Sequence, residues 1–319
     1  MKRCSHISAL FVFIIVMSAC LSLVPLKVGP PKEISIELTP ERIERGRYLA
    51  FHVTGCIDCH SRREWKSYSG PLIPGTEGMG GVSTGKKFGI PGTVYAMNIT
   101  PFELGDWTDG EIVQAITAGV NRKGRAIFPI MPYLNYAEMS KEDVFSIVAF
   151  LRTLKPIPNK VQKRKLNFFA SYFIRTIPRH YYPRSEVDDS DAVRYGEYLT
   201  TIAACISCHT RKTKLGRLIK GMEFAGGVTL PVPGGGIVIS SNITPDHETG
   251  IGDWTKVDFI ERFKEFASLD VKKIIVPKDR KDFNTIKAWT FYASMTETDL
   301  GSIYLYLMSL KPVKNKILN

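Results

Sequence analysis

The sequence predicts an all-α protein built as a tandem duplication of two small helical domains with long loops rich in Gly and Pro. Two observations lead there: an ordered set of motifs occurs twice, and helix start signals lie at matching places in both copies. No run of alternating apolar and polar residues indicates a sheet. We expect a leader at 1–28, a first domain at 29–156, a linker at 157–189 and a second domain at 190–319.

The leader predicts export. It opens with Lys2 and Arg3 and continues as a nearly uncharged apolar run to about Leu26, a pattern typical of exported proteins. The run approaches the ~20 residues that span a bilayer, and an uncleaved anchor would leave the body outside, as the positive-inside rule prefers. We therefore expect the protein at the periplasmic side of a bacterial cytoplasmic membrane.

Two other fates of the leader stay open. The tetrapeptide MSAC, which ends at Cys20, resembles a bacterial lipobox in which that cysteine is lipidated, although methionine fits its first position poorly. A plain secreted form is the third outcome. We favour the anchor, and either the anchor or the lipid would tether the protein to a membrane.

The charge balance indicates the kind of partner. The 319 residues include 43 Lys and Arg against 31 Asp and Glu, a formal net charge of +12. In an exported protein this excess favours association with an acidic docking surface or an anionic membrane. Nucleic acid is excluded as a partner because no nucleic-acid motif accompanies the charge and the location does not suit one.

The internal repeat covers almost all of the chain after the leader. The first copy contains GRYL from Gly46, CIDCH from Cys56, GG from Gly80, NITP from Asn98, GDWT from Gly105 and LKP from Leu154. The second contains GEYL from Gly196, CISCH from Cys205, GG from Gly226, NITP from Asn242, GDWT from Gly252 and LKP from Leu310. Each unit is about 120 residues, an ordinary size for one domain.

Helix start signals recur in both copies. They are Thr39-Pro40 with Ser190-Asp191, Thr108 and Glu111 with Thr255 and Asp258, and Ser140 and Asp143 with Thr296 and Asp299. The signals at Ser140 and Thr296 each precede an apolar stripe at helical spacing. The stripes are formed by Val144, Ile147, Val148 and Leu151 and by Leu300, Ile303, Tyr304 and Leu307.

The two C-x-x-C-H strings carry the chemistry. This pattern is the attachment signature of a covalently bound c-type haem. Thiols three residues apart share one side of a helical turn, so both reach one porphyrin, and the following histidine turns to the iron. A zinc site or a thioredoxin-like motif does not require that histidine.

The sequence therefore predicts two covalently bound haem c groups. The attachment residues are Cys56, Cys59, Cys205 and Cys208, and the iron ligands are His60 and His209. The remaining cysteines, Cys4 and Cys20, fall in the leader, so the body keeps no pair for a disulfide.

A methionine thioether usually completes the iron coordination in electron-transfer cytochromes. Met131, in the rigid sequence FPIMPY, is the predicted ligand of the first haem. Met79, in a glycine-rich turn, and Met139, at the start of an amphipathic helix, compete with it.

The second copy lacks this methionine, because Lys287 stands opposite Met131 in IKAW against IMPY. Three interpretations stay open: Lys287 binds the iron as a neutral amine, or the iron is five-coordinate with Lys287 turned to solvent or to a haem propionate. Alternatively another residue substitutes, namely Met295, Met222 or His247. In the first two cases the second haem should have the lower potential, since it loses the thioether that favours ferrous iron.

Three further assignments concern supporting residues. A metal-bound histidine usually donates its other N–H to a carbonyl, and we expect residues 70–72 to provide it for His60 and 216–218 for His209. The pairs Trp107 with Trp254 and Asn98 with Asn242 either bond haem propionates or serve packing and turns. The linker, with basic residues and an aromatic patch from Phe168 to Phe173, is either a packed strap or a docking surface.

Together these motifs resemble the class I cytochrome c family. The resemblance rests on a helix leading to C-x-x-C-H, the Gly-Pro-Leu at 70–72, a Met-Pro loop and a C-terminal helix. The chain is similar to the multihaem cytochrome subunits of bacterial membrane-bound alcohol and gluconate dehydrogenases, in which NITP, G-x-W-T and M-P-Y-x-x-Y recur in each domain. Lys287 departs from the family pattern.

The resemblance implies a membrane-tethered electron carrier between a dehydrogenase and a terminal oxidase or soluble cytochrome. No Ser/His/Asp set, paired carboxylates or phosphate loop indicates an independent catalytic activity. The alternative is a haem enzyme or sensor whose second iron, open or gated by Lys287, acts on peroxide or a small gas.

Overall fold

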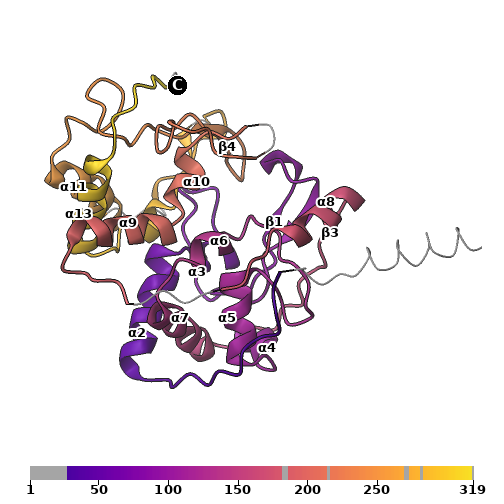
Figure 1. The fold of residues 1–319 in the computed structure, drawn as a ribbon. Helices are drawn as coiled ribbons and strands as arrows, with labels where there is room; N and C mark the ends of the chain where they lie inside the picture. Colours follow the sequence, from indigo (N-terminus) through magenta and orange to yellow (C-terminus); the bar gives the residue numbers. More distant parts are fainter. Residues whose placement is uncertain (1–26, 182–185, 214–215, 269–272, 281–282, 318–319) are drawn as a thin grey trace, which may run out of the picture.

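Two helix pairs organise the chain in the computed structural model, which describes residues 27–181, 186–213, 216–268, 273–280 and 283–317. In the first half (residues 29–156), α2 (Pro40–Tyr48) packs along α7 (Lys141–Thr153); in the second half (residues 190–319), α9 (Ala192–Ile202) packs along α13 (Glu297–Ser309) (Figure 1). The described residues are therefore mostly helical, as expected.

The remaining helices flank and connect these pairs. The first half adds η1 (Leu49–Val53), α3 (Cys56–His60), η2 (Lys86–Phe88), α4 (Pro101–Leu104), α5 (Asp109–Ala118) and α6 (Tyr133–Tyr136). The linker contributes α8 (Phe168–Phe173) and η3 (Ile174–Thr176), and the second half adds α10 (Cys205–His209), α11 (Lys256–Ser268) and α12 (Trp289–Tyr292).

The predicted helix starts are confirmed by their capping bonds. The side chain of Thr39 caps α2 by accepting from the Arg42 amide at 3.3 Å. Asp191 caps α9 in the same way, and Thr108 forms a complete capping box with Glu111 at the start of α5. Each cap satisfies backbone N–H groups that the first helical turn leaves without a partner.

A glycine in each N-terminal helix lets the helix pairs approach closely. A Cβ atom added to Gly46 would lie 1.8 Å from the carbonyl oxygen of Ser146, and one added to Gly196 would lie 1.9 Å from that of Ser302. Because the obstructing atoms belong to the backbone of α7 and α13, no side-chain movement could make room. The glycine of the G-x-Y-L motif thus sets the helix crossing in both halves.

The two halves share one continuous hydrophobic core. The predicted stripe of α7 is fully buried at Val144, Ile147 and Val148, and that of α13 is buried at Leu300 and Leu307. Both stripes belong to the same cluster of packed apolar side chains. Packing therefore holds the halves against each other, in addition to the linker.

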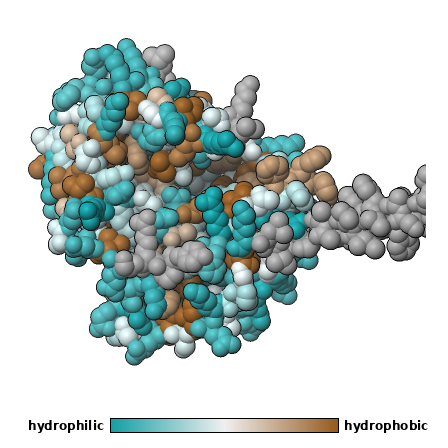
Figure 2. Space-filling model, in the orientation of Figure 1, coloured by the Kyte–Doolittle hydropathy of each residue, from teal (hydrophilic) through white to brown (hydrophobic). Residues whose placement is uncertain are grey.

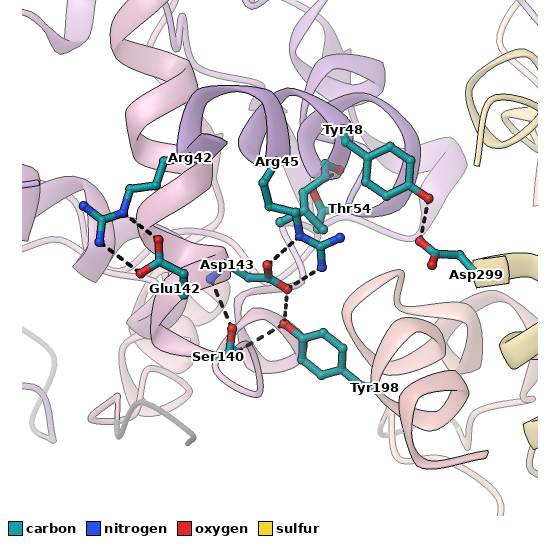
Figure 3. Close-up of polar contacts among 10 residues, drawn as sticks. Arg42, Arg45, Tyr48, Thr54, Ser140, Glu142, Asp143, Tyr198 and Asp299 are labelled. Carbon is teal, nitrogen blue, oxygen red and sulfur yellow. Dashed lines mark hydrogen bonds and ion pairs between the residues drawn. The ribbon is translucent and has the colours of Figure 1, made fainter. Parts of the chain in front are cut away.

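A reciprocal pair of polar contacts also joins the halves (Figure 3). The Tyr198 hydroxyl, from α9, donates to Asp143 Oδ2 at 2.6 Å and accepts from the Ser140 amide at 3.2 Å, so it binds the first turn of α7. Tyr48, from α2, makes the mirror contact by donating to Asp299 Oδ2 at 2.5 Å and accepting from the Thr296 amide. The tyrosine of each G-x-Y-L motif therefore caps the terminal helix of the opposite half.

Short strands are the part of the fold that the sequence did not predict. An antiparallel sheet of β1 (Ser83–Thr84), β2 (Gly92–Tyr95) and β3 (Lys165–Leu166) lies beside the first half. A two-stranded sheet of β4 (Thr229–Pro231) and β5 (Ile237–Ile239) lies in the second. The expectation of no sheet was wrong, because strands of two to four residues are too short to show alternation.

The linker packs as a strap on the first half and leaves its aromatic side chains exposed. Its strand β3 pairs with β2, and the Asn98 side chain donates to the Ile157 carbonyl at 2.9 Å. Phe168, Phe169 and Phe173 in α8 remain 63%, 77% and 70% exposed, and α8 forms a tan projection in Figure 2. The strap interpretation therefore describes the backbone, and the aromatic patch stays available to a partner.

In the described ranges, which begin at Lys27, no helix combines the length and apolarity needed to cross a bilayer. The predicted anchor, and the cysteines at positions 4 and 20, lie outside the described residues.

Candidate functional site

Both C-x-x-C-H motifs form one-turn helices with the same entry. Gly55, before α3, has φ +67°, and Ala204, before α10, has φ +54°. A residue in the left-handed backbone conformation therefore directly precedes each motif. In each helix the two cysteines are free thiols three residues apart, and they therefore share one side of the turn. Two motifs that are 149 positions apart in the sequence thus present their thiols in the same way.

Each motif histidine is oriented by a backbone carbonyl. His60 Nδ1 lies 2.7 Å from the Met97 carbonyl oxygen, and His209 Nδ1 lies 2.8 Å from that of Ser241. A carbonyl accepts only, so Nδ1 carries the proton and Nε2 keeps the lone pair that a metal requires. Burial lowers the pKa of both imidazoles, that of His209 to about 4, which favours the neutral ligand form.

The expected carbonyl acceptors for these histidines were wrong. Residues 70–72 instead fold back on the preceding loop, where the Pro71 carbonyl accepts from the Glu64 amide and Leu72 bridges Arg63. The true acceptors, Met97 and Ser241, directly precede the two NITP motifs. The signal that could have found them is this repeated motif, which follows both histidines, with the acceptor 37 residues after His60 and 32 residues after His209.

The NITP motif holds the carbonyl-bearing turn in place. Asn98 Oδ1 accepts from the Thr100 amide and hydroxyl, and its Nδ2 donates to the Ile157 carbonyl just after the LKP motif. Asn242 repeats this with Thr244 and with the Val313 carbonyl. Because both asparagines are occupied by backbone and neighbouring side chains, the turn-forming alternative is the one that the structure supports for them.

Met131 and Lys287 occupy equivalent turns. The Met131 carbonyl accepts from the Tyr133 amide at 2.8 Å, and the Lys287 carbonyl accepts from the Trp289 amide at 2.9 Å. A four-residue helix begins two positions later in each case, at α6 and α12. The intervening residues also match, with φ −81° and ψ 51° at Pro132 and φ −79° and ψ 57° at Ala288.

Lys287 is half-buried close to the second motif. Its Nζ lies 3.7 Å from the ring centroid of Trp289 and 4.7 Å from that of Phe263. Burial lowers the pKa of this amine to about 8, while the neighbouring thiol of Cys205 acts in the opposite direction. The amine in turn lowers the pKa of His209, after the larger effect of burial, so both groups face the same space.

The competing ligands of the second half lie elsewhere. Met295 is 1% exposed in the apolar core, the position that Met139 holds in the first half. His247 is exposed, and its Nδ1 pairs with Asp253 at 2.7 Å. Met222 is half-buried in the loop that follows the second motif, where its carbonyl accepts from the Ala225 amide.

Two tyrosines, the buried Tyr136 and the half-buried Tyr292, lie near both motifs. Burial raises the pKa of Tyr136 and Tyr292 well above the ordinary value, and the thiol of Cys59 contributes to both shifts. Burial likewise raises the pKa of Cys59 to about 12, with a smaller contribution from Cys208 of the other motif. These mutual effects place the two motifs within electrostatic range of each other.

The residues present fit covalent haem. Each motif offers two free thiols on one helical turn and one imidazole with Nε2 available. The turns that carry Met131 and Lys287, called here the sixth-position turns, are followed by Tyr133 and Thr290, whose buried hydroxyls have no protein partner among the described residues. Such unpartnered hydroxyls are expected where a polar group of a cofactor completes the site. Within those same ranges no group of three His, Cys, Asp or Glu side chains is placed so that it could hold a bare metal ion.

Known proteins with similar sequences are c-type cytochromes. The cytochrome c subunit of the quinone alcohol dehydrogenase of Gluconacetobacter polyoxogenes is 26% identical over 85% of this chain and 56% of its own length. The cytochrome c subunit of gluconate 2-dehydrogenase of Pantoea cypripedii is 26% identical over 72% of this chain and 52% of its own. A diheme cytochrome c-type protein of Cereibacter sphaeroides is 29% identical over 74% and 76%.

The chain spans about half the length of the dehydrogenase subunits that it matches. No family model matches it. The relatives nevertheless agree in kind, and they support the multihaem c-type cytochrome family for this chain.

Proposed function

We propose, from its kinship with the multihaem c-type cytochromes, that this chain binds two haem c groups covalently and carries electrons from a dehydrogenase to a terminal oxidase or soluble cytochrome. The observation that carries the proposal is the pair of motif helices, each with its histidine oriented by a backbone carbonyl. Relatives named as cytochrome subunits of alcohol and gluconate dehydrogenases support the dehydrogenase as donor.

In this proposal the chain is a tandem duplication with domains at 29–156 and 190–319, joined by the linker at 157–189. The matching helix pairs, glycine crossings and reciprocal tyrosine contacts support it. Because the two motifs lie within electrostatic range of each other, electrons would pass between the domains within one molecule.

The first haem would be held by Cys56 and Cys59, with His60 and Met131 as its iron ligands. When bound, haem supplies a one-electron couple between ferric and ferrous iron. The prolines on either side of Met131 fix the backbone of its turn, so little entropy is lost when the thioether is held at the sixth position.

The second haem would be held by Cys205 and Cys208, with His209 as proximal ligand and Lys287 as sixth ligand. An amine binds a metal only when it is neutral, and burial of Lys287 favours that form. Replacing a soft thioether by a nitrogen donor favours ferric iron, so the second haem has the lower potential.

The protein would act on the periplasmic side of the cytoplasmic membrane, tethered by its leader at 1–28 or by a lipid on Cys20. The net charge of +12 suits an acidic docking surface on its redox partners. The exposed aromatic side chains of α8 offer an apolar contact area beside basic residues of the linker.

Cyanide binding to the purified ferric protein tests electron transfer against the alternative of a haem enzyme or sensor. We expect two covalent haems per chain, both low-spin, and slow cyanide binding, because both sixth positions are filled by protein. Lys287→Ala should bind cyanide quickly at one haem. If the wild type binds cyanide quickly and turns over peroxide, the protein is instead a haem enzyme whose second iron is open or gated by Lys287.

A further inference from the structure

A loop of the first half covers the turn that carries Lys287 in the second half. The loop, residues 63–70, directly follows the first haem motif. Its backbone pairs with the opposite segment at two places, where the Tyr68 amide donates to the Ile274 carbonyl and the Val276 amide donates to the Lys66 carbonyl, both at 2.9 Å. The sixth-position turn of the second half is therefore covered by chain from the first.

Ser69 makes the closest contact with this turn. Its hydroxyl donates to the Lys287 carbonyl at 2.6 Å and accepts from the Trp289 amide at 3.1 Å, so it bridges the two ends of the turn. Its own amide donates to Asn284 Oδ1 at 2.9 Å. Ser69 is fully buried; its amide and hydroxyl bind the second half, while its carbonyl accepts from the Arg63 side chain of its own loop at 2.6 Å.

The backbone of Ser69 is held in an unfavourable conformation. Its φ of +58° lies in the left-handed region, which residues other than glycine adopt rarely. Such a conformation persists where the surroundings impose it. The bonds to Asn284 and to the Lys287 turn hold Ser69 from the second half, and the Arg63 side chain, which donates to the Ser69 and Gly70 carbonyls, holds it from the first.

The first half has a different means of fixing its own sixth-position turn. Met131 is preceded by Pro129 and followed by Pro132, whose rings restrict the backbone. The matching positions around Lys287 are Thr285 and Ala288, which impose no such restriction. A hydrogen-bonded bridge from Ser69 therefore stands where the first half uses proline.

We propose that Ser69 is a positioning residue for the second haem, holding the turn that places Lys287 at the sixth position. The inference rests on the proposed function, in which Lys287 is the sixth ligand. It follows that the first domain, through the loop after its own haem motif, controls how readily an external ligand displaces Lys287 from the second iron.

The test measures cyanide binding to the full-length ferric holoprotein, together with the potentials of both haems. Ser69→Gly removes the hydroxyl and accepts the positive φ, so folding is preserved; Ser69→Ala removes the same group and retains Cβ. We expect cyanide to bind the second haem at least about tenfold faster in both variants, because both hydrogen bonds of the Ser69 hydroxyl to the turn are lost. The first-haem potential should stay unchanged.

Ser67→Ala is the matched control, because it removes a buried hydroxyl from the same loop that takes no part in the bridge. It should leave the cyanide rate at the wild-type value. Lys287→Ala sets the rate for a fully open iron. If Lys287→Ala accelerates binding and Ser69→Gly does not, the positioning role is wrong while the ligand stands. If Lys287→Ala itself changes nothing, the ligand assignment is wrong, and the role of Ser69 falls with it.

Discussion

At the scale of single residues, the two halves differ most at one pair of side chains. Met131 and Lys287 follow the same backbone path, and each precedes a four-residue helix. Their donor atoms differ in softness and in charge, since only the amine must lose a proton before it can bind iron. In the proposed function, the exchange of methionine for lysine in turns of matching backbone shape is enough to make the two haem centres unequal.

The variant Met131→Ala should open the first iron. Without the thioether, carbon monoxide should bind the reduced first haem, and its potential should fall because the ligand that favours ferrous iron is gone. Absorption spectroscopy under carbon monoxide measures the first effect and a redox titration measures the second. Met139→Ala is the control, since it truncates a buried methionine of the core; an unchanged first haem in Met131→Ala would show that another residue is the ligand.

At the scale of elements, the helices were predictable and the sheets were not. A capping bond such as Thr108 to Glu111 joins residues three apart, so sequence alone reveals it. The sheet that pairs β2 with β3 depends on the linker returning to the first half. Its strands are two to four residues long, too short to give a periodic signal in the sequence.

The same distinction applies to the candidate site. The thiols and histidines were predictable because one helical turn contains them. The carbonyl that orients His60 comes from Met97, 37 residues later, and its identity depends on how an intervening loop folds. The contact of Ser69 with Lys287 spans 218 residues and joins the two halves, so no local pattern indicates it.

The variant Gly46→Ala should destabilise the helix pair of the first half. Alanine in an exposed helix interior is more favourable than glycine by roughly 0.5–1 kcal/mol. Here the new Cβ would meet the Ser146 carbonyl oxygen at 1.8 Å, and such overpacking costs about 1–3 kcal/mol or more. Urea denaturation of the holoprotein measures the change.

Gly29→Ala is the matched control for this variant, because a Cβ atom there meets nothing within 4 Å. It should leave the free energy of unfolding within about 0.5 kcal/mol of the wild type. A stabilising effect of Gly46→Ala would mean that α2 and α7 do not cross at this glycine.

At the scale of the whole molecule, the halves are joined by a shared core and by the reciprocal tyrosine contacts. The contacts are not equivalent. Asp143 is also paired with Arg45, at 2.8 Å and 3.0 Å, whereas the residue matching Arg45 in the second half is Tyr195. Asp299 therefore relies more on Tyr48 than Asp143 does on Tyr198.

Tyr48→Phe should consequently cost more stability than Tyr198→Phe. We expect losses of about 2 and about 1 kcal/mol, because a buried carboxylate left without its partner loses more than one that keeps an arginine. Urea denaturation measures both. Tyr95→Phe, which removes a surface hydroxyl bonded to Gln162, is the control. Equal losses in the two variants would contradict the difference between the contacts.

The most direct test of the central claim, two unequal haem c centres in one chain, is a spectroelectrochemical titration of the holoprotein with its covalent haem counted. We expect two haems and two separate one-electron steps. Lys287→Met should raise the lower potential by about 60 mV or more, at least a tenfold shift towards ferrous iron. A single haem per chain, or two haems with one common potential that Lys287→Met leaves unchanged, would contradict the claim.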